Sequence, residues 1–156
     1  MTSNDDPAAG HARFHQLSAA VRDSRPDDDP ALLQALLAEP DRIMAESVLT
    51  LLVDSRAEGP GAATSFGAWA EPMLDAVGAD GFVARRVHEW SLFKALQSGA
   101  PVDREALAAA SNWLQRKLVE EADSAAVLAV LGEAGRTKRL RNLAKTRAGR
   151  LRSPGR

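Results

Sequence analysis

The chain has 156 residues, 45% of them hydrophobic, and a net charge of −1, values that favour one globular domain with a substantial core. It contains no cysteine, which excludes disulfides, thiolate catalysis and cysteine-based zinc sites. The N-terminus lacks the basic-then-apolar order of a signal peptide, and no apolar run approaches the roughly 18–20 residues of a membrane span, so we expect a cytoplasmic protein with no membrane span.

Alanine dominates the composition with thirty copies, whereas residues that favour strands are scarce: ten Val, one Ile and no Tyr. Because alanine is the best helix former, we predict an all-α protein. About six to seven short antiparallel helices are expected, arranged as stacked helical hairpins or as an irregular bundle. Sixteen Arg against four Lys, together with the alanine excess, suggest a bacterial source with a GC-rich genome.

Residues 1–28 form the first segment, which we predict to be a flexible acidic N-terminal arm. A short helix over His11–Arg25 fits the pattern, because apolar residues recur there at i, i+3 and i+7. The stretch Pro26–Pro30 breaks any helix, since proline restricts its own φ angle and the three aspartates between the prolines repel one another. The arm offers little to bury, and this is the reason to expect flexibility.

Residues 29–135 form the second segment, a predicted domain of helical hairpins. Asp29 can cap a helix whose first residue is Pro30, the favoured first-turn proline. Pro40 starts a second helix after a very short break, and Gly59-Pro60-Gly61 ends it. Two antiparallel helices joined by a tight turn are therefore expected at the start of this domain.

Four further helices are predicted in the same domain. One covers about Thr64–Val77 and contains Pro72, which should kink or split it. The next covers Phe82–Gln97, a third runs from its cap Asp103 to about Glu121, and the last follows its cap Asp123. The side chains expected to face inward in this domain include Ile43, Met44, Val48, Phe66, Trp69, Met73, Phe82, Val87, Trp90, Leu114 and Leu128.

Residues 136–156 form the third segment, a basic helix and tail. The segment carries nine bases and no acid, whereas residues 1–60 have a net charge of −6 and residues 61–135 of −4. Its helix is expected from Arg136 to about Arg150 with a thin apolar side. The near-zero net charge of the chain therefore hides a strongly basic C-terminal segment. Such a segment indicates an interaction with a partner or a pairing with the acidic remainder of the chain.

Two stretches resemble HEAT-type helical repeats. They are the helix pair over Asp29–Asp54 and the segment Ala125–Ala144, AAVLAVLGEAGRTKRLRNLA, and the likeness lies in short Ala/Leu-rich helix pairs whose second helix is charged and contains arginine. The resemblance covers about half of the chain and implies a short solenoid of stacked hairpins. It further implies a scaffold for protein or nucleic-acid partners, with no catalytic residues to transfer.

The candidate metal ligands are His11 and His15, which share one helix face at i, i+4, a geometry that can hold Zn²⁺ or Ni²⁺. The sequence provides no complete ligand set beside them. We therefore expect two exposed histidines and no metal site.

The candidate residues for an enzymatic pocket are Arg86, His88 and Glu89 on the helix Phe82–Gln97. Adjacent residues on a helix point about 100° apart, so Glu89 does not orient His88 as a base. The sequence also shows no placed nucleophile and no glycine-rich phosphate loop. We expect no catalytic residue, no cofactor and no enzymatic activity.

The basic C-terminal segment is the strongest signal for a partner. A basic helix suits nucleic-acid phosphates and equally an acidic protein surface, or its charges pair with the acidic remainder of the chain. Of the three tryptophans, Trp69 and Trp90 are expected in the core and Trp113 nearer the surface. The residues expected to contact a partner are Arg136, Lys138, Arg139, Arg141, Lys145, Arg147, Arg150 and Trp113.

These features predict a non-enzymatic scaffold or adaptor that binds a macromolecule, most often a protein, through its helix faces. The alternative is a nucleic-acid-binding accessory protein that uses the basic C-terminal helix. The net negative charge of residues 1–135 weighs against that alternative, because it repels phosphate.

Overall fold

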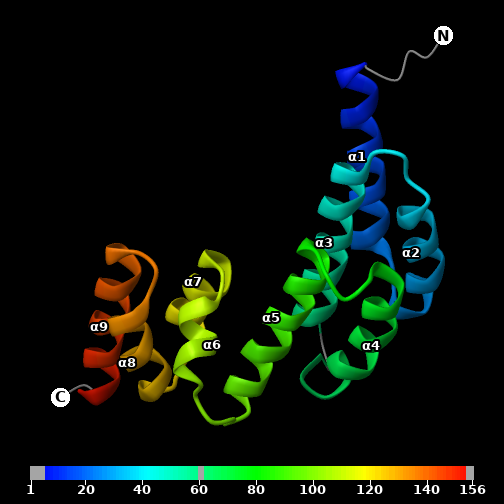
Figure 1. Ribbon diagram of the computed structural model, residues 1–156. Helices are drawn as coiled ribbons and strands as arrows, with labels where there is room; N and C mark the ends of the chain where they lie inside the picture. The colour runs from blue at the N-terminus through cyan, green and yellow to red at the C-terminus, as the bar shows by residue number, and fades with distance from the viewer. Residues whose placement is uncertain (1–5, 60–61, 154–156) are drawn as a thin grey trace. The chain divides into compact units, whose positions relative to one another are not determined.

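The computed structural model describes residues 6–59 and 62–153, and over these ranges it contains helices and no strand (Figure 1), which confirms the all-α prediction. Residues 1–5, 60–61 and 154–156 lie outside the described residues, and with them the start of the predicted arm, part of the helix stop at 59–61 and the end of the basic tail. The helices are α1 (Pro7–Asp23), α2 (Asp29–Leu37), α3 (Arg42–Glu58), α4 (Ala62–Val77), α5 (Phe82–Gln97), α6 (Arg104–Ala109), α7 (Asn112–Glu121), α8 (Ala125–Ala134) and α9 (Lys138–Arg152), with a 3₁₀ turn, η1 (Pro26–Asp28), before α2.

The chain divides into two compact units, Met1–His88 and Glu89–Arg156, and the division falls inside α5. Composition placed the segment boundaries elsewhere, after residues 28 and 135. The first unit carries seven bases and fourteen acids, a net charge of −7, and the second carries thirteen bases and seven acids, a net charge of +6. The charge asymmetry of the sequence therefore follows the two units of the structure.

Helix α3 is the centre of the first unit, where it contacts α1, α2 and α4. It begins after Asp41, whose Oδ1 accepts a hydrogen bond from the backbone N–H of Met44 at 3.0 Å. Val48, Leu52 and Val53 have no exposed surface at all. Ile43 is 80% exposed, so its predicted inward position is wrong: the buried stripe of α3 runs through the fully buried residues and turns Ile43 toward solvent.

Helix α1 lies beside α3 (Figure 1) and begins four residues earlier than predicted, because Asp6 caps it and Pro7 occupies its first turn. Its contact with the core is confined to one end. Leu17 and Val21 are buried, whereas almost every residue before them in the helix is exposed. The packing that holds α1 therefore begins at Leu17 and not at the N-terminus of the helix.

We expect amide exchange to divide α1 into two parts. The amides of residues 7–15 should exchange rapidly, since no buried side chain anchors them, and those of residues 17–23 should be protected by the packing of Leu17 and Val21 on α3. Exchange measured by mass spectrometry on overlapping peptides checks this. Uniform protection along the whole helix would contradict it and, with it, the flexibility predicted for the arm.

A buried carboxylate ties the helices of the first unit together. Asp29 is the first residue of α2, and its carboxylate accepts hydrogen bonds from Arg56 Nε at 2.8 Å and Nη2 at 2.6 Å and from Trp69 Nε1 at 2.8 Å. Arg56 Nη2 also donates to Ser24 Oγ at 2.7 Å, and the hydrogen bond to Asp29 raises the pKa of the Arg56 guanidinium. The predicted role of Asp29 as a helix cap is wrong, because its carboxylate accepts hydrogen bonds from Arg56 of α3 and Trp69 of α4 instead.

Helix α4 remains one helix from Ala62 to Val77 with Pro72 inside it, so the proline does not split it. Proline removes a single i→i−4 hydrogen bond, and Pro72 lies on the exposed side of the helix. The next helix, α5, starts with Phe82, which is 56% exposed. Its predicted inward position is wrong, because the first buried residue of α5 is Val83.

The second unit contains a helix break that was not predicted. The single helix predicted over Asp103–Glu121 is two helices, α6 and α7, separated at Ser111. Asp103 caps α6 as predicted, and Ser111 Oγ caps α7 by accepting a hydrogen bond from Leu114 N at 3.2 Å. Glu89 fixes the break, since its two carboxylate oxygens accept from Ser111 N at 3.1 Å and Ser111 Oγ at 2.6 Å.

The four C-terminal helices are stacked in a regular order. Helix α8 packs against α9, α6 contacts α8, and α7 contacts α9, so each helix of one pair lies on the equivalent helix of the next. The cap of α8 is Ser124 and not the predicted Asp123. Gln115 has no exposed surface and joins the pairs: its Nε2 donates to Leu107 O at 2.8 Å, and its Oε1 accepts from Arg136 N at 2.9 Å.

Candidate partner-binding surface

The basic C-terminal segment forms α9, which is held against the rest of the second unit by small side chains. Thr137 caps the helix by accepting a hydrogen bond from Leu140 N at 3.1 Å. Leu140, Ala144 and Ala148 are its buried residues. The apolar side of α9 is as thin as the sequence indicated, so a close approach to α8 must provide the packing.

Two glycines of α8 and the following turn allow this approach. A Cβ atom at Gly135 would lie 2.6 Å from the carbonyl oxygen of Leu131 and 3.1 Å from Cγ of Arg141. A Cβ atom at Gly132 would lie 3.1 Å from Cγ of Lys145. These two glycines therefore set the distance between α8 and α9.

Replacing Gly135 with alanine should lower the free energy of unfolding of the second unit by about 1–3 kcal/mol, because the added methyl group overlaps a backbone oxygen that cannot rotate away. Gly149, inside α9, is the matched control, since a Cβ there meets nothing within 4 Å. Gly149→Ala should stabilise the helix by about 0.5–1 kcal/mol. Urea denaturation followed by circular dichroism gives both values, and equal signs for the two variants would contradict the packing described for Gly135.

Three of the predicted partner-binding arginines are engaged within the protein. Each donates a hydrogen bond from Nη1 to a backbone carbonyl at the C-terminal end of α6, α7 or α8, where carbonyl groups lack helical partners and a positive charge is favourable. The pairs are Arg136 with Ala110 at 3.1 Å, Arg141 with Gly135 at 2.7 Å and Arg147 with Val119 at 2.6 Å. These three side chains fasten the stacked helices to one another.

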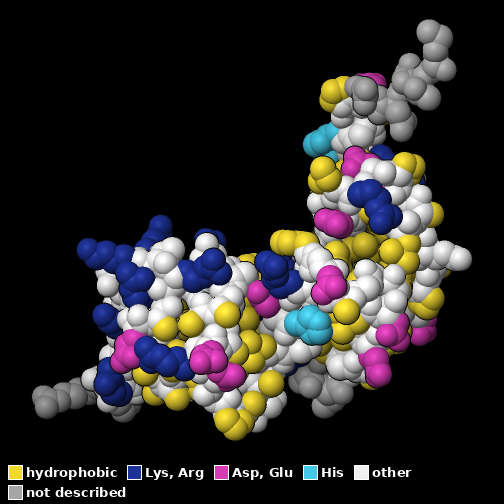
Figure 2. Space-filling view, in the orientation of Figure 1, with side chains coloured by type: hydrophobic (Ala, Val, Ile, Leu, Met, Phe, Trp, Pro, Cys, Tyr) yellow, Lys and Arg dark blue, Asp and Glu magenta, His cyan; other side chains and the backbone are white. Residues whose placement is uncertain are grey.

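The remaining four predicted contacts on α9 face solvent. Lys138, Arg139, Lys145 and Arg150 are exposed, and within the part of the chain that the structure describes none of them makes a hydrogen bond or ion pair. We call these four residues the basic patch. Figure 2 shows Lys and Arg side chains gathered on the surface over the C-terminal helices.

A groove of about 330 Å³ runs between α7 and α9, next to Arg139 of the basic patch. Arg116 of α7 and Arg139 of α9 line it, together with Leu140 and Leu143, and Leu143 is 40% exposed. The other lining residues are Asn112, Glu120 and Thr137. The groove thus combines an apolar strip with two guanidinium groups and one carboxylate.

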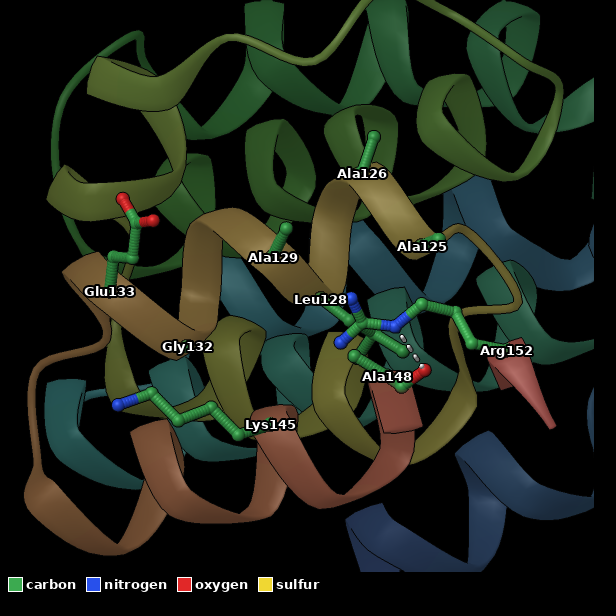
Figure 3. Close-up of a pocket in the computed structure, with 9 residues that line it drawn as sticks. All are labelled: Ala125, Ala126, Leu128, Ala129, Gly132, Glu133, Lys145, Ala148 and Arg152. Carbon is green, nitrogen blue, oxygen red and sulfur yellow. Dashed lines mark hydrogen bonds between the residues drawn. The ribbon is translucent and has the colours of Figure 1, made fainter. Parts of the chain in front are cut away.

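A second pocket, of about 510 Å³, lies between α8 and α9 (Figure 3). Its α8 wall consists mainly of alanines, and Glu133, Lys145 and Arg152 provide its charged groups. Arg152 reaches back from the end of α9 and donates from Nε to Ala148 O at 3.3 Å. The α7–α9 groove differs from this pocket in having the 40% exposed Leu143 beside two guanidinium groups.

The tryptophan predicted to contact a partner is half-buried. The Trp113 ring lies 5.4 Å from that of Trp90, which is 2% exposed, and the Trp90 ring is flanked by Lys117 Nζ at 4.6 Å from its centroid. Burial, and then the charge of Lys117, lowers the pKa of Lys94 on the same cluster. Trp90 belongs to the core as predicted. Trp113 packs against it within the second unit.

The candidate enzymatic residues do not converge on one site. Arg86 pairs with Asp54 through Nε at 3.0 Å, Glu89 accepts hydrogen bonds from Ser111, and His88 is exposed. Over residues 6–59 and 62–153, no group of three or more His, Cys, Asp or Glu side chains is arranged to hold a metal ion. Across the same ranges, no helix has the length and hydrophobicity needed to cross a membrane.

Comparison with known proteins identifies no relative: no family model, no curated protein and no solved structure matches this chain. The likeness to HEAT-type repeats therefore stays a prediction.

Proposed function

We propose that this protein is a non-enzymatic scaffold or adaptor that binds an acidic segment of another protein along the α7–α9 groove. The observation that carries the proposal is the division of the basic residues of α9 into two groups. Three arginines hold backbone carbonyls, whereas the four residues of the basic patch have no partner among the described residues. Charges left uncompensated on one helix attract a partner of opposite charge.

The composition of the groove favours a protein over a nucleic acid. Arg139, Leu143 and Arg150 recur at i, i+4 and i+11 and therefore share one face of α9. An exposed leucine between arginines suits an amphipathic helix that carries apolar and acidic residues, since such a helix lays its apolar face into a groove. Phosphates gain nothing from Leu143. The stacked helix pairs α6–α7 and α8–α9 support the proposal of a HEAT-like scaffold, in which helix faces form the binding surface.

Photo-crosslinking in the native cell tests this proposal. A benzoylphenylalanine in place of Leu143 should capture a discrete acidic protein, and the same probe in place of Ile43, an exposed residue of the first unit, should not. Converting the basic patch to glutamine should abolish the Leu143 adduct. Converting four exposed arginines of the first unit, Arg22, Arg25, Arg42 and Arg85, removes the same charge elsewhere and should leave it intact. Identical adducts from positions 143 and 43 would overturn the proposal.

The uncompensated charge of the basic patch also supports the alternative, which is that the protein binds nucleic acid. That alternative predicts binding to a labelled 20-base-pair duplex or to single-stranded RNA that weakens steeply with salt. Removing the four patch charges should then reduce the slope of log K against log salt by about 3–4. Full deletion of α9 is unsuitable for either test, because it would expose Leu128 and Leu131 on α8. Salt-sensitive duplex binding with no protein adduct would favour the alternative.

A further inference from the structure

The two histidines of α1 face each other across one helical turn. His11 Nε2 and His15 Nε2 are 2.9 Å apart, and the ring centroids are 4.4 Å apart with an interplanar angle of 85°. Both side chains are exposed, on the part of the helix that precedes its buried residues. Figure 2 shows histidine at the surface of this end of the first unit. The two nitrogen atoms thus converge on one point that is open to solvent.

The distance between the two Nε2 atoms suits two ligands bound to the same metal ion. Bonds of about 2.0–2.1 Å from a metal to two imidazole nitrogens at a right angle place those nitrogens about 3 Å apart. Without a metal, the same two atoms can share only one proton in an N–H···N hydrogen bond. A metal can therefore replace that proton with little movement of either ring.

We propose that His11 and His15 form a bidentate clamp for a divalent transition-metal ion, with Cu²⁺ and Ni²⁺ preferred over Zn²⁺. Imidazole nitrogens suit these ions, and Cu²⁺ stands at the top of the affinity order for divalent first-row metals. The sequence predicted two exposed histidines and no metal site, and the convergence of the Nε2 atoms is the observation that changes this view.

Among residues 6–59 and 62–153 no side chain completes the coordination sphere, which leaves positions for water or for ligands from solution. Within the described ranges no third His, Cys, Asp or Glu joins the pair, and Asp6, which precedes α1, accepts a hydrogen bond from Ala8 N at 3.0 Å. A metal held by two protein ligands exchanges readily. The site is therefore an exchangeable surface site and not a structural one, and it is independent of the α7–α9 groove.

Titration of the full-length, untagged chain with Cu²⁺ and with Ni²⁺, followed by calorimetry, tests the clamp. One equivalent should bind, and His11→Ala or His15→Ala should each weaken binding roughly 10²-fold, because the second ligand acts at high effective concentration. The double variant His15→Ala, Gln16→His keeps three histidines but changes the spacing to i, i+5, and it should bind as weakly as the single variants. His88→Ala, at an exposed histidine outside the pair, should have no effect.

A second measurement separates the clamp from other ligands for the same ion. Bound Ni²⁺ should slow amide exchange across residues 7–15 about tenfold or more, because the metal links two turns of the exposed part of α1. The same addition to the double variant should leave exchange unchanged. Tight binding by the double variant, or binding to the wild-type chain without slower exchange in α1, would overturn the proposal.

Discussion

Replacement of Asp29 with alanine should lower the free energy of unfolding of the first unit by about 3–5 kcal/mol. The carboxylate is buried and accepts hydrogen bonds from Nε and Nη2 of Arg56 and from the indole N–H of Trp69. Its removal leaves a guanidinium with 13% exposure without its charge partner, and an indole without an acceptor. Asp29→Asn should cost less, since an amide oxygen still accepts one of these hydrogen bonds.

Urea denaturation combined with amide exchange localises this effect. Protection should fall across α3 and remain unchanged in α8, because the hydrogen bonds of Asp29 all lie within the first unit. Glu133→Ala is the matched control: it removes the ion pair with Arg104, whose side chains are 66% and 58% exposed, and should cost at most about 1 kcal/mol. Equal losses in the two variants would show that burial does not strengthen the Asp29–Arg56 pair.

Replacement of Gln115 with methionine should destabilise the second unit by about 2–4 kcal/mol. Methionine has a similar shape, so the change removes hydrogen bonds with little loss of packing. The backbone N–H of Arg136 then loses its acceptor, and Leu107 O loses the donor that ties α6 to the turn before α9. The cost arises mainly at Arg136 N, which is left without an acceptor, whereas Leu107 O keeps the hydrogen bond from Ala110 N at 3.3 Å.

Thermal and urea denaturation of Gln115→Met check this expectation against Gln97→Met, at an exposed position near the end of α5. The control should change the free energy of unfolding by less than about 0.5 kcal/mol. Gln115→Glu keeps an acceptor for Arg136 N but loses the donor to Leu107 O, and it also buries a carboxyl group. A stability of Gln115→Met close to that of the wild type would mean that the α6–α7 pair and the α8–α9 pair are held together mainly by apolar contacts.

The position of the candidate surface depends on which basic side chains of the C-terminal segment are used for hydrogen bonds within the protein. Arg136, Arg141 and Arg147 were expected to contact a partner on the basis of charge alone, and the structure places their guanidinium groups on carbonyls at helix ends. A count of charges along the chain cannot separate these arginines from Arg139 or Arg150, because the separation depends on which helix ends lie within reach. The groove itself was not predicted, since Arg116 is 23 residues away from Arg139 in the sequence.

Much of the secondary structure could be predicted from local chemistry. The abundance of alanine and the scarcity of β-branched residues determined the all-α class, and Asp103 was identified correctly as a helix cap. Gly99 follows the end of α5, where its φ of 87° favours glycine over other residues. Capping, helix propensity and turn preference act over a few residues, so they can be inferred without knowing what a segment packs against.

Features that depend on residues far apart in the sequence could not be predicted, because they arise from the packing of the helices. The break between α6 and α7 is fixed by Glu89, 22 residues before Ser111, and the role of Asp29 by Arg56 and Trp69, 27 and 40 residues away. Each of these polar side chains had several local partners available in sequence. Burial selects among them, because a buried carboxylate or amide must satisfy its hydrogen bonds with whatever donors the packed helices bring to it.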